Sequence, residues 1–162
     1  MKSGPPEGVR TTFGARPGPA GHKLGAMSLH QLLTATLARR RAVNPAYSLR
    51  AFAQSLGVHH ATLVRLLGGR TVAKPGCVQR LGRRLGLADT EIQQLSLAEA
   101  RRGVCRAITR RDFRPDSRWL AAVTGLPLDA VNVALQRLLV DRVLVMRGRR
   151  DWQLQNPLEA NR

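Results

Sequence analysis

Apolar residues recur three or four positions apart along most of the chain between residues 28 and 140, and this spacing predicts a protein built mainly from helices. The first predicted helix begins at Ser28 and ends in three consecutive arginines, Arg39 to Arg41, before the breaker Asn44-Pro45. Its apolar positions are Leu29, Leu32, Leu33 and Leu37. Such a stripe predicts that one side of the helix packs on a core.

Two short helices joined by a tight turn are predicted between Ser48 and Gly68. Ser48 is a favourable N-cap for the first. Only Gly57-Val58 separates it from the second, which begins at His59 or His60 and ends at two glycines. The inner apolar positions of the pair are Leu49, Phe52, Ala53, Leu56, Ala61, Leu63, Leu66 and Leu67. A short helix, a tight turn with glycine and a second short helix form a helix-turn-helix.

Three more helices are predicted before residue 110. One begins at Lys74-Pro75, where proline is tolerated in the first turn, and stops at Gly86. The next has Asp89 and Glu91 in its first turn, where negative charge is favourable. A separate linking helix is expected around residues 104–108. The apolar positions of these helices are Val78, Leu81, Leu85, Ile92, Leu95, Val104, Cys105 and Ile108.

The last third of the chain repeats the helical pair and adds a hairpin. A helix follows Pro115-Asp116, a turn is expected at residues 124–127, and a strongly amphipathic helix follows over residues 128–138. Residues 143–146 and 152–154 then predict two short strands around a basic turn. Helix, turn, helix and basic hairpin is the layout of a winged helix.

The predicted fold class is therefore all-α with a small β-hairpin wing. We expect a disordered basic arm over residues 1–27, because its glycines and prolines cannot offset the entropy of ordering. A five-helix repressor-type helix-turn-helix domain over residues 28–100, a winged-helix-like module over residues 101–155 and a frayed tail over residues 156–162 complete the organisation.

Charge is distributed very unevenly along the chain. The formal net charge is +17, and the window from Gly8 to Ala88 holds 13 Lys and Arg without one Asp or Glu. From Asp89 onward 13 basic residues face 9 acidic ones. A composition biased toward arginine explains why 24 of the 27 basic residues are Arg, but it does not explain eighty residues without a carboxylate. Such a field attracts polyanions, of which nucleic acid is the commonest.

Several function classes are excluded by what the sequence lacks. No histidine or cysteine spacing typical of a metal site is present, and no glycine-rich phosphate loop with lysine. We therefore expect a protein that is not an enzyme and that uses no metal or cofactor. No apolar run is long enough to span a membrane, and Met1 to Pro6 lack the apolar segment of a secretory signal. Two cysteines fit a reduced cytoplasmic location, associated with the nucleoid.

Residues 48–70 resemble the helix-turn-helix of phage-repressor-type (XRE-like) regulators. The matching marks are Phe52-Ala53, Leu56-Gly57-Val58, Leu63, Leu66 and Gly69, with Leu81-Gly82, Leu85-Gly86-Leu87 and Glu91 behind them. From Ala46 to Trp152 the chain also resembles a bacterial paralogous family of predicted transcription regulators, which join this domain to a winged-helix-like segment. Residues 113–120 look like the opening of that segment.

The resemblance implies that the second helix of the pair lies in the major groove with its first residues toward base edges. We expect base-edge contacts from His60, Ala61 and Arg65, with a phosphate contact as the alternative for Arg65 and an idle exposed ring as the alternative for His60. The expected phosphate contacts are Ser48, Arg50, Thr62, Arg70 and Lys74.

Polar residues of the second module are the remaining candidate contacts. They are Asn132, Gln136 and Arg137 on the amphipathic helix and Arg147, Arg149 and Arg150 at the hairpin tip. Dimerisation through this module is the competing interpretation, because Asp129, Asp141 and Asp151 lie beside these surfaces.

The sequence therefore predicts a sequence-specific DNA-binding transcription regulator that binds double-stranded DNA, with a homodimer expected of the motif. No small-molecule effector is identifiable from the sequence. Two alternatives stay open: a nonspecific nucleic-acid-binding protein of the nucleoid or of RNA, and an adaptor that docks proteins on its helix-turn-helix surfaces.

Overall fold

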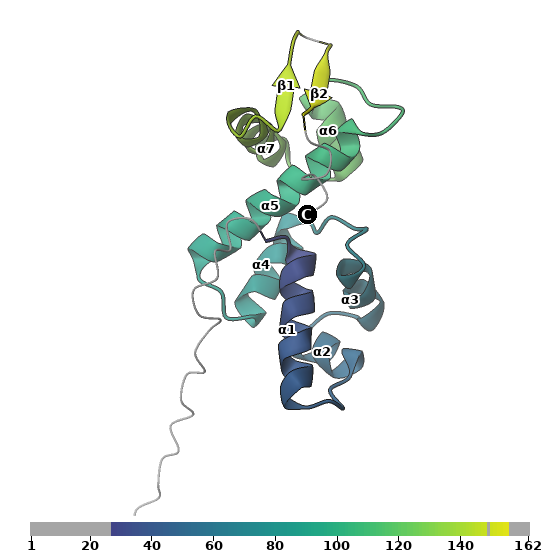
Figure 1. Ribbon diagram of the computed structural model, residues 1–162, viewed down its shortest axis with the longest axis vertical. Helices are drawn as coiled ribbons and strands as arrows, with labels where there is room; N and C mark the ends of the chain where they lie inside the picture. The colour runs from purple at the N-terminus through teal and green to yellow at the C-terminus, as the bar shows by residue number, and fades with distance from the viewer. Residues whose placement is uncertain (1–26, 149, 156–162) are drawn as a thin grey trace, which may run out of the picture.

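The computed structural model describes residues 27–148 and 150–155. This part of the chain contains seven helices and one two-stranded antiparallel sheet (Figure 1). The predicted basic arm, apart from residue 27, the predicted frayed tail and Arg149 lie outside the described residues. The elements are α1 (Leu29–Val43), α2 (Leu49–Leu56), α3 (His60–Leu67), α4 (Pro75–Arg84), α5 (Asp89–Ile108), α6 (Ser117–Thr124), α7 (Leu128–Val140), β1 (Leu144–Met146) and β2 (Trp152–Leu154).

The first four helices begin and end where the sequence predicts. Ser28 forms a capping box with Gln31 at the start of α1, and the Ser48 side chain accepts a hydrogen bond from the backbone of residue 51 at the start of α2. Gly57 ends α2 in the left-handed conformation, with φ of 65°, which a residue with a Cβ adopts only at a cost. Local signals therefore mark where α1 begins and where α2 begins and ends.

One aliphatic core holds α1 to α4 against the first half of α5. Phe52 is fully buried in this core, and α3 packs on both α1 and α2. The other buried members of this cluster are Leu29, Leu32, Leu33, Leu37, Ala53, Leu56, Leu63, Leu66, Ala73, Val78, Leu81, Leu87, Ile92 and Leu95. Burial of this many aliphatic side chains supplies most of the driving force that orders the short helices.

Helix α5 is longer than the sequence analysis predicts. Residues 104–108 belong to the same 20-residue helix as Asp89, so the expectation of a separate linking helix is wrong. Between Leu95 and Ala100 the buried residues of α5 pass from one core to the other. The expected division at residue 100 falls inside this helix, and Figure 1 shows α5 running between the two groups of elements.

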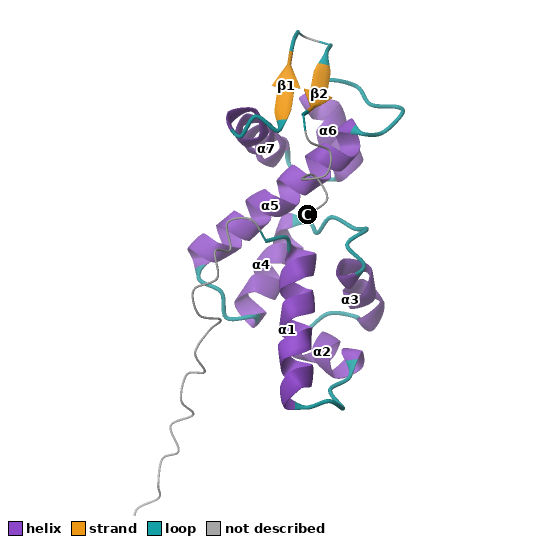
Figure 2. Ribbon diagram, viewed as in Figure 1, coloured by secondary structure: helices purple, strands orange, loops and turns teal. Residues whose placement is uncertain are grey.

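The second core gathers α6, α7 and the hairpin around the C-terminal half of α5. Leu144 pairs with Leu154 and Met146 with Trp152 in the antiparallel β1–β2 ladder (Figure 2). Phe113 packs edge-on against Trp119 with ring centroids 5.7 Å apart and lies 6.0 Å from the Trp152 ring. The small sheet is therefore attached to the helices through aromatic side chains, and its identity as a wing stays a prediction.

The α6–α7 pair bends sharply at the turn that the sequence predicts. Asp116 caps α6, and Gly125 ends it in the left-handed conformation with φ of 68°.

Within residues 27–148 and 150–155, no single helix has the length and apolar composition to cross a bilayer. Among the described helices, the pair α6 and α7 meets that test only when the two are taken together, and their axes differ by 113° at the break.

Candidate nucleic-acid interface

Helix α3 has one buried and one exposed side. Leu63 and Leu66 point into the first core and are almost fully buried. The side chains at the four positions between and beside them are exposed, and they are His60, Ala61, Val64 and Arg65. His60 and Arg65 were expected to face outward, whereas the expectation that Ala61 belongs to the inner apolar positions is wrong, because its place on the helix turns it away from Leu63 and Leu66. In Figure 1 α3 lies at the side of the molecule with no other described element outside it.

The start of α3 leaves its first backbone donors without a side-chain cap. His59 stands at the N-cap position, and its side chain makes no capping hydrogen bond. The N–H groups of the first turn carry the positive end of the helix dipole. Exposed N–H groups at a helix start are well suited to a phosphate oxygen.

The predicted phosphate-contacting residues lie on α3 or on the segments that precede and follow it in the chain. Arg50, Arg70 and Lys74 are exposed, while Thr62 is half-buried. Ser48 is exposed, but its Oγ accepts a hydrogen bond from the residue 51 N–H at 3.1 Å, so its first role is to cap α2. Ser48 and Arg50 stand at the start of α2, Thr62 lies on α3, and Arg70 and Lys74 belong to the α3–α4 loop, so their contact with phosphates stays a prediction.

The cations of α2, α3 and the α3–α4 loop form no ion pair with the described part of the chain. The ion pairs found among residues 27–148 and 150–155 are Arg101–Asp141, Glu99–Arg102 and Arg110–Asp112, and none of them involves α1 to α4. Arg40 has a structural role instead. Its Nη1 donates to the hydroxyls of Tyr47 and Ser55, and its guanidinium lies over the Phe52 ring. Charge on α2 and α3 is therefore available to a polyanion.

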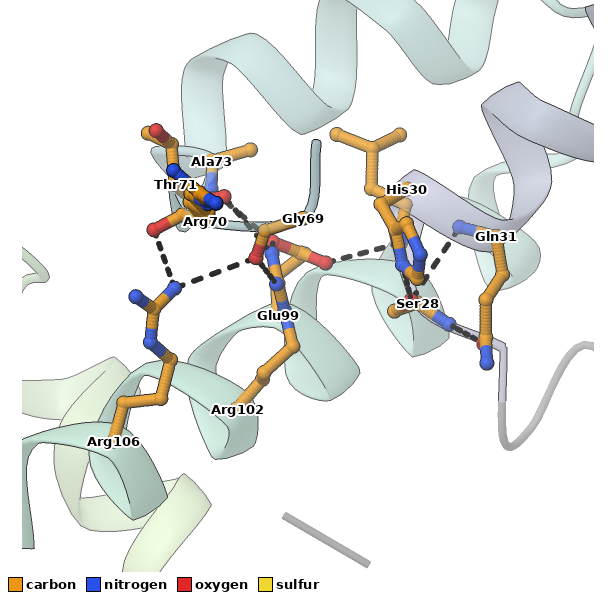
Figure 3. A network of polar contacts seen from close by, with 11 residues as sticks. Ser28, His30, Gln31, Gly69, Arg70, Thr71, Ala73, Glu99, Arg102 and Arg106 are labelled. Atoms are coloured by element: carbon orange, nitrogen blue, oxygen red, sulfur yellow. Dashed lines mark hydrogen bonds and ion pairs between the residues drawn. The ribbon is translucent and has the colours of Figure 1, made fainter. Parts of the chain in front are cut away.

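A buried carboxylate fixes the loop that follows α3, and the sequence analysis missed it. Glu99 of α5 is 1% exposed. Its two oxygens accept hydrogen bonds from the backbone N–H of Leu29 at 3.0 Å and of Ala73 at 3.1 Å. Arg102 donates to the same carboxylate at 2.8 Å (Figure 3). Glu99 therefore ties the start of α1 and the α3–α4 loop to α5.

Two arginines of α5 hold the backbone of the same loop. Arg102 donates to the carbonyls of Gly69 and Thr71, and Arg106 donates to those of Gly69 and Arg70 (Figure 3). Charge-assisted hydrogen bonds of this kind are stronger than neutral ones. In the sequence, Glu99 and Arg102 have the spacing of an ordinary surface pair on a helix, so no local signal marks them as buried.

The predicted contacts of the second module are exposed but lie apart from α3. Asn132, Gln136 and Arg137 project from α7, and Arg147 and Arg150 lie in the hairpin turn. Arg149 falls outside the described residues. In Figure 1 α7 and the hairpin stand at the opposite end of the molecule from α2 and α3, with α5 between them. The structure does not bring the two predicted sets into one surface.

Reactive and metal-binding groups are sparse in the described part of the chain. No group of three or more His, Cys, Asp or Glu lies close enough to hold a metal ion there. Cys77 and Cys105 are both free thiols. Burial raises the pKa of Cys105 to about 11, against the smaller opposing effect of the Arg101 charge. This thiol stays protonated at neutral pH and packs as a small apolar side chain.

Comparison with known proteins agrees with this geometry. Residues 32–95 match the model of the family described as a helix-turn-helix domain, from the first turns of α1 to Leu95 of α5. The match supports a helix-turn-helix of the XRE-like type. It ends at Leu95, which is also the last residue of the first core. No curated protein and no solved structure matches the chain. The resemblance of the remaining residues to a paralogous family of regulators stays a prediction.

Proposed function

We propose that this chain, a DNA-binding protein whose residues 32–95 form a helix-turn-helix domain of the XRE-like type, is a sequence-specific transcription regulator of a bacterium or phage, acting in the cytoplasm. The observation that carries the proposal is the division of α3 into a buried aliphatic side and an exposed side that bears His60, Ala61 and Arg65. An α-helix fits the major groove of B-DNA, where each base pair presents its own pattern of donors and acceptors.

Arg65 is the proposed principal base reader. It is exposed one turn after the start of α3 and has no ion-pair partner among the described residues. A guanidinium donates two parallel hydrogen bonds to guanine O6 and N7. Ala61 would contact a thymine methyl group, and His60 would donate to a base or phosphate. Arg50, Arg70 and Lys74 would neutralise phosphates and fix the register of α3.

The second module is proposed to hold two copies together. Two-fold dimers that read half-sites about one helical turn apart are expected of this motif. Both signs of charge occur on α7 and its ends, where Asp129 and Asp141 accompany Arg137. Asp141 is already paired with Arg101 at 2.9 Å. Mixed charge suits a protein surface better than a phosphate backbone.

Selection of bound sites from random double-stranded DNA by the purified full chain tests the proposal. A sequence-specific protein enriches one motif, and a dimer enriches a palindrome whose half-sites are about one helical turn apart. Competition at moderate salt separates the alternatives. Unrelated DNA that competes as well as the selected site would establish a nonspecific nucleic-acid binder. Absence of DNA binding at low salt, with a protein partner retained, would establish the adaptor.

The variant Arg65→Ala sharpens the test. We expect it to weaken binding to the selected site by about 1–3 kcal/mol and to relax the preference at one base pair. Arg50→Ala is the matched control, because it removes the same charge from a proposed phosphate contact. It should weaken all sequences alike and lower the salt dependence of binding. Uniform weakening by Arg65→Ala would move Arg65 from the base readers to the phosphate contacts.

A further inference from the structure

A polar cavity opens beside the end of α3, on the side where α5 passes the α3–α4 loop. Its volume is about 570 Å³. Three arginines and a histidine contribute to its wall, and none of its lining residues is acidic. The lining residues are His30, Gly68, Gly69, Arg70, Arg102, Arg106 and Thr109. A cavity with this lining differs from the exposed face of α3, because its arginines come from two separate segments, the α3–α4 loop and α5.

The guanidinium of Arg106 is held in place but only partly used. Its Nη1 donates to the carbonyls of Gly69 and Arg70 (Figure 3). No hydrogen bond from its Nε or Nη2 to any residue within 27–148 or 150–155 is present. These two nitrogens form one edge of the guanidinium, and that edge matches two oxygens of an oxyanion. The loop carbonyls thus orient an arginine whose binding edge is unoccupied by protein.

Arg102 adds a second donor without a partner. This side chain is 8% exposed, and its Nε is the one buried side-chain nitrogen or oxygen of the described residues that lacks a hydrogen bond. A buried N–H left without a partner costs free energy, and because this nitrogen is buried, Arg102 contributes to the cavity through its charge. The remaining donors of Arg102 go to Glu99 and to the loop carbonyls. Glu99 compensates only one of the three arginines around the cavity.

We propose that this cavity binds a phosphate group, held by the free edge of Arg106 with Arg70 and Arg102 supplying further positive charge. One free guanidinium edge beside two further arginines, without a lining carboxylate, favours a compact oxyanion with more than one negative charge. Two sources carry this group: a backbone phosphate of DNA bound outside α3, and a free phosphate or phosphate ester. The site rests on cavity geometry and not on the proposed sequence specificity.

Titration of the full chain with inorganic phosphate, without DNA and at constant ionic strength, tests the site. Backbone amide NMR signals of Gly69 and Arg70 should shift and saturate with one phosphate per chain. Arg106→Gln should weaken this binding at least tenfold. Arg111→Gln is the matched control, because Arg111 is exposed beyond the end of α5 and does not line the cavity, and its affinity should stay within twofold of wild type.

A third variant separates loss of the guanidinium from a change in the conformation of the α3–α4 loop, which Arg106 contacts. Arg106→Lys keeps the charge but loses the fork, so we expect an affinity between those of wild type and Arg106→Gln. The proposal is overturned if wild type shows no saturable phosphate binding, or if Arg106→Gln binds phosphate as tightly as wild type. Equal affinities of Arg106→Lys and wild type would also overturn the role of the guanidinium edge.

Binding of DNA then distinguishes the two sources. If a DNA phosphate fills the cavity, Arg106→Gln makes DNA binding less dependent on salt, and the magnitude of the slope of log affinity against log salt falls by about one. Bound DNA then also abolishes the NMR shifts that inorganic phosphate induces. If the ligand is a free phosphate group, the slope is unchanged and the DNA complex still binds phosphate. Both outcomes support the site. Failure to select a specific DNA sequence would overturn the proposed regulator and leave the phosphate titration intact.

Discussion

Replacement of the buried Glu99 by glutamine is the most direct test of how the helix-turn-helix is held together. The carboxylate accepts hydrogen bonds at 3.0 Å from Leu29, at 3.1 Å from Ala73 and at 2.8 Å from Arg102. Glutamine has the same shape, but one of its two acceptors becomes an NH₂ group. That group would face a donor and leave at least one buried N–H without a partner.

The expected cost follows from the burial of the pair. Glu99 and Arg102 are 1% and 8% exposed, so loss of one charge leaves the other unpaired in the interior. Breaking a buried ion pair from one side costs about 3–5 kcal/mol, whereas a surface pair contributes below about 1 kcal/mol. Against a total stability of about 5–15 kcal/mol for a domain, the Glu99→Gln loss is a large fraction.

Urea unfolding followed by circular dichroism at 222 nm measures the effect. The matched control is Glu91→Gln on the same helix, where Oε2 accepts from the Ala88 N–H in a capping arrangement that glutamine also forms. Its free energy of unfolding should stay within about 1 kcal/mol of wild type. In a double-mutant cycle with Arg102→Met, the two changes should be less than additive. A Glu99→Gln protein within about 1 kcal/mol of wild type at unchanged m-value would refute the reasoning.

Three further predictions concern the two cores. Leu63→Asp places an unpaired charge at a fully buried position, so far-UV circular dichroism should show loss of helix. A variant that keeps its full helix content would mean that this side of α3 does not belong to the core. Gly82→Ala would bring a Cβ within 2.6 Å of Ile92 Cγ1, and calorimetry should show a loss of about 1–3 kcal/mol, whereas an unchanged melting temperature would contradict this close helix contact. Because the folded pKa of Cys105 is raised to about 11, the unfolded thiol ionises first, and the free energy of unfolding should fall by about 2 kcal/mol between about pH 9 and 11. Cys105→Ala should remove this slope, and an identical pH profile in that variant would assign the loss to other groups.

The helix ends and the inner face of α3 could be predicted from the sequence, because contacts between residues close in the chain determine them. Ser48 caps α2, Gly57 ends it with a positive φ, and Asp116 caps α6, each through contacts within three or four residues. The inner face of α3 follows from spacing alone, since Leu63 and Leu66 have to share one side of a helix. The outward position of Arg65 follows from the same geometry.

The rest depends on contacts between distant segments. Nothing near Ala100 marks the passage of α5 from one core to the next, because a helix that changes partners keeps its hydrogen bonds and only rotates its apolar stripe. Glu99 meets Leu29 across 70 positions and Ala73 across 26. Such convergence has no periodicity, so the buried network and the cavity beside it emerge only with the tertiary structure.

The unbroken course of α5 determines where this molecule can be cut. A fragment ending at residue 100 would keep every residue of the helix-turn-helix proper, yet it would discard Arg102 and Arg106, whose side chains clamp the backbone at Gly69. It would also leave Glu99 one residue from the new terminus and without its Arg102 partner. Truncations meant to isolate the DNA-binding part should therefore extend to Thr109, where the helix ends. A fusion of this helix-turn-helix to another module faces the same constraint. The arginines that hold the α3–α4 loop, Arg102 and Arg106, lie beyond the expected division at residue 100.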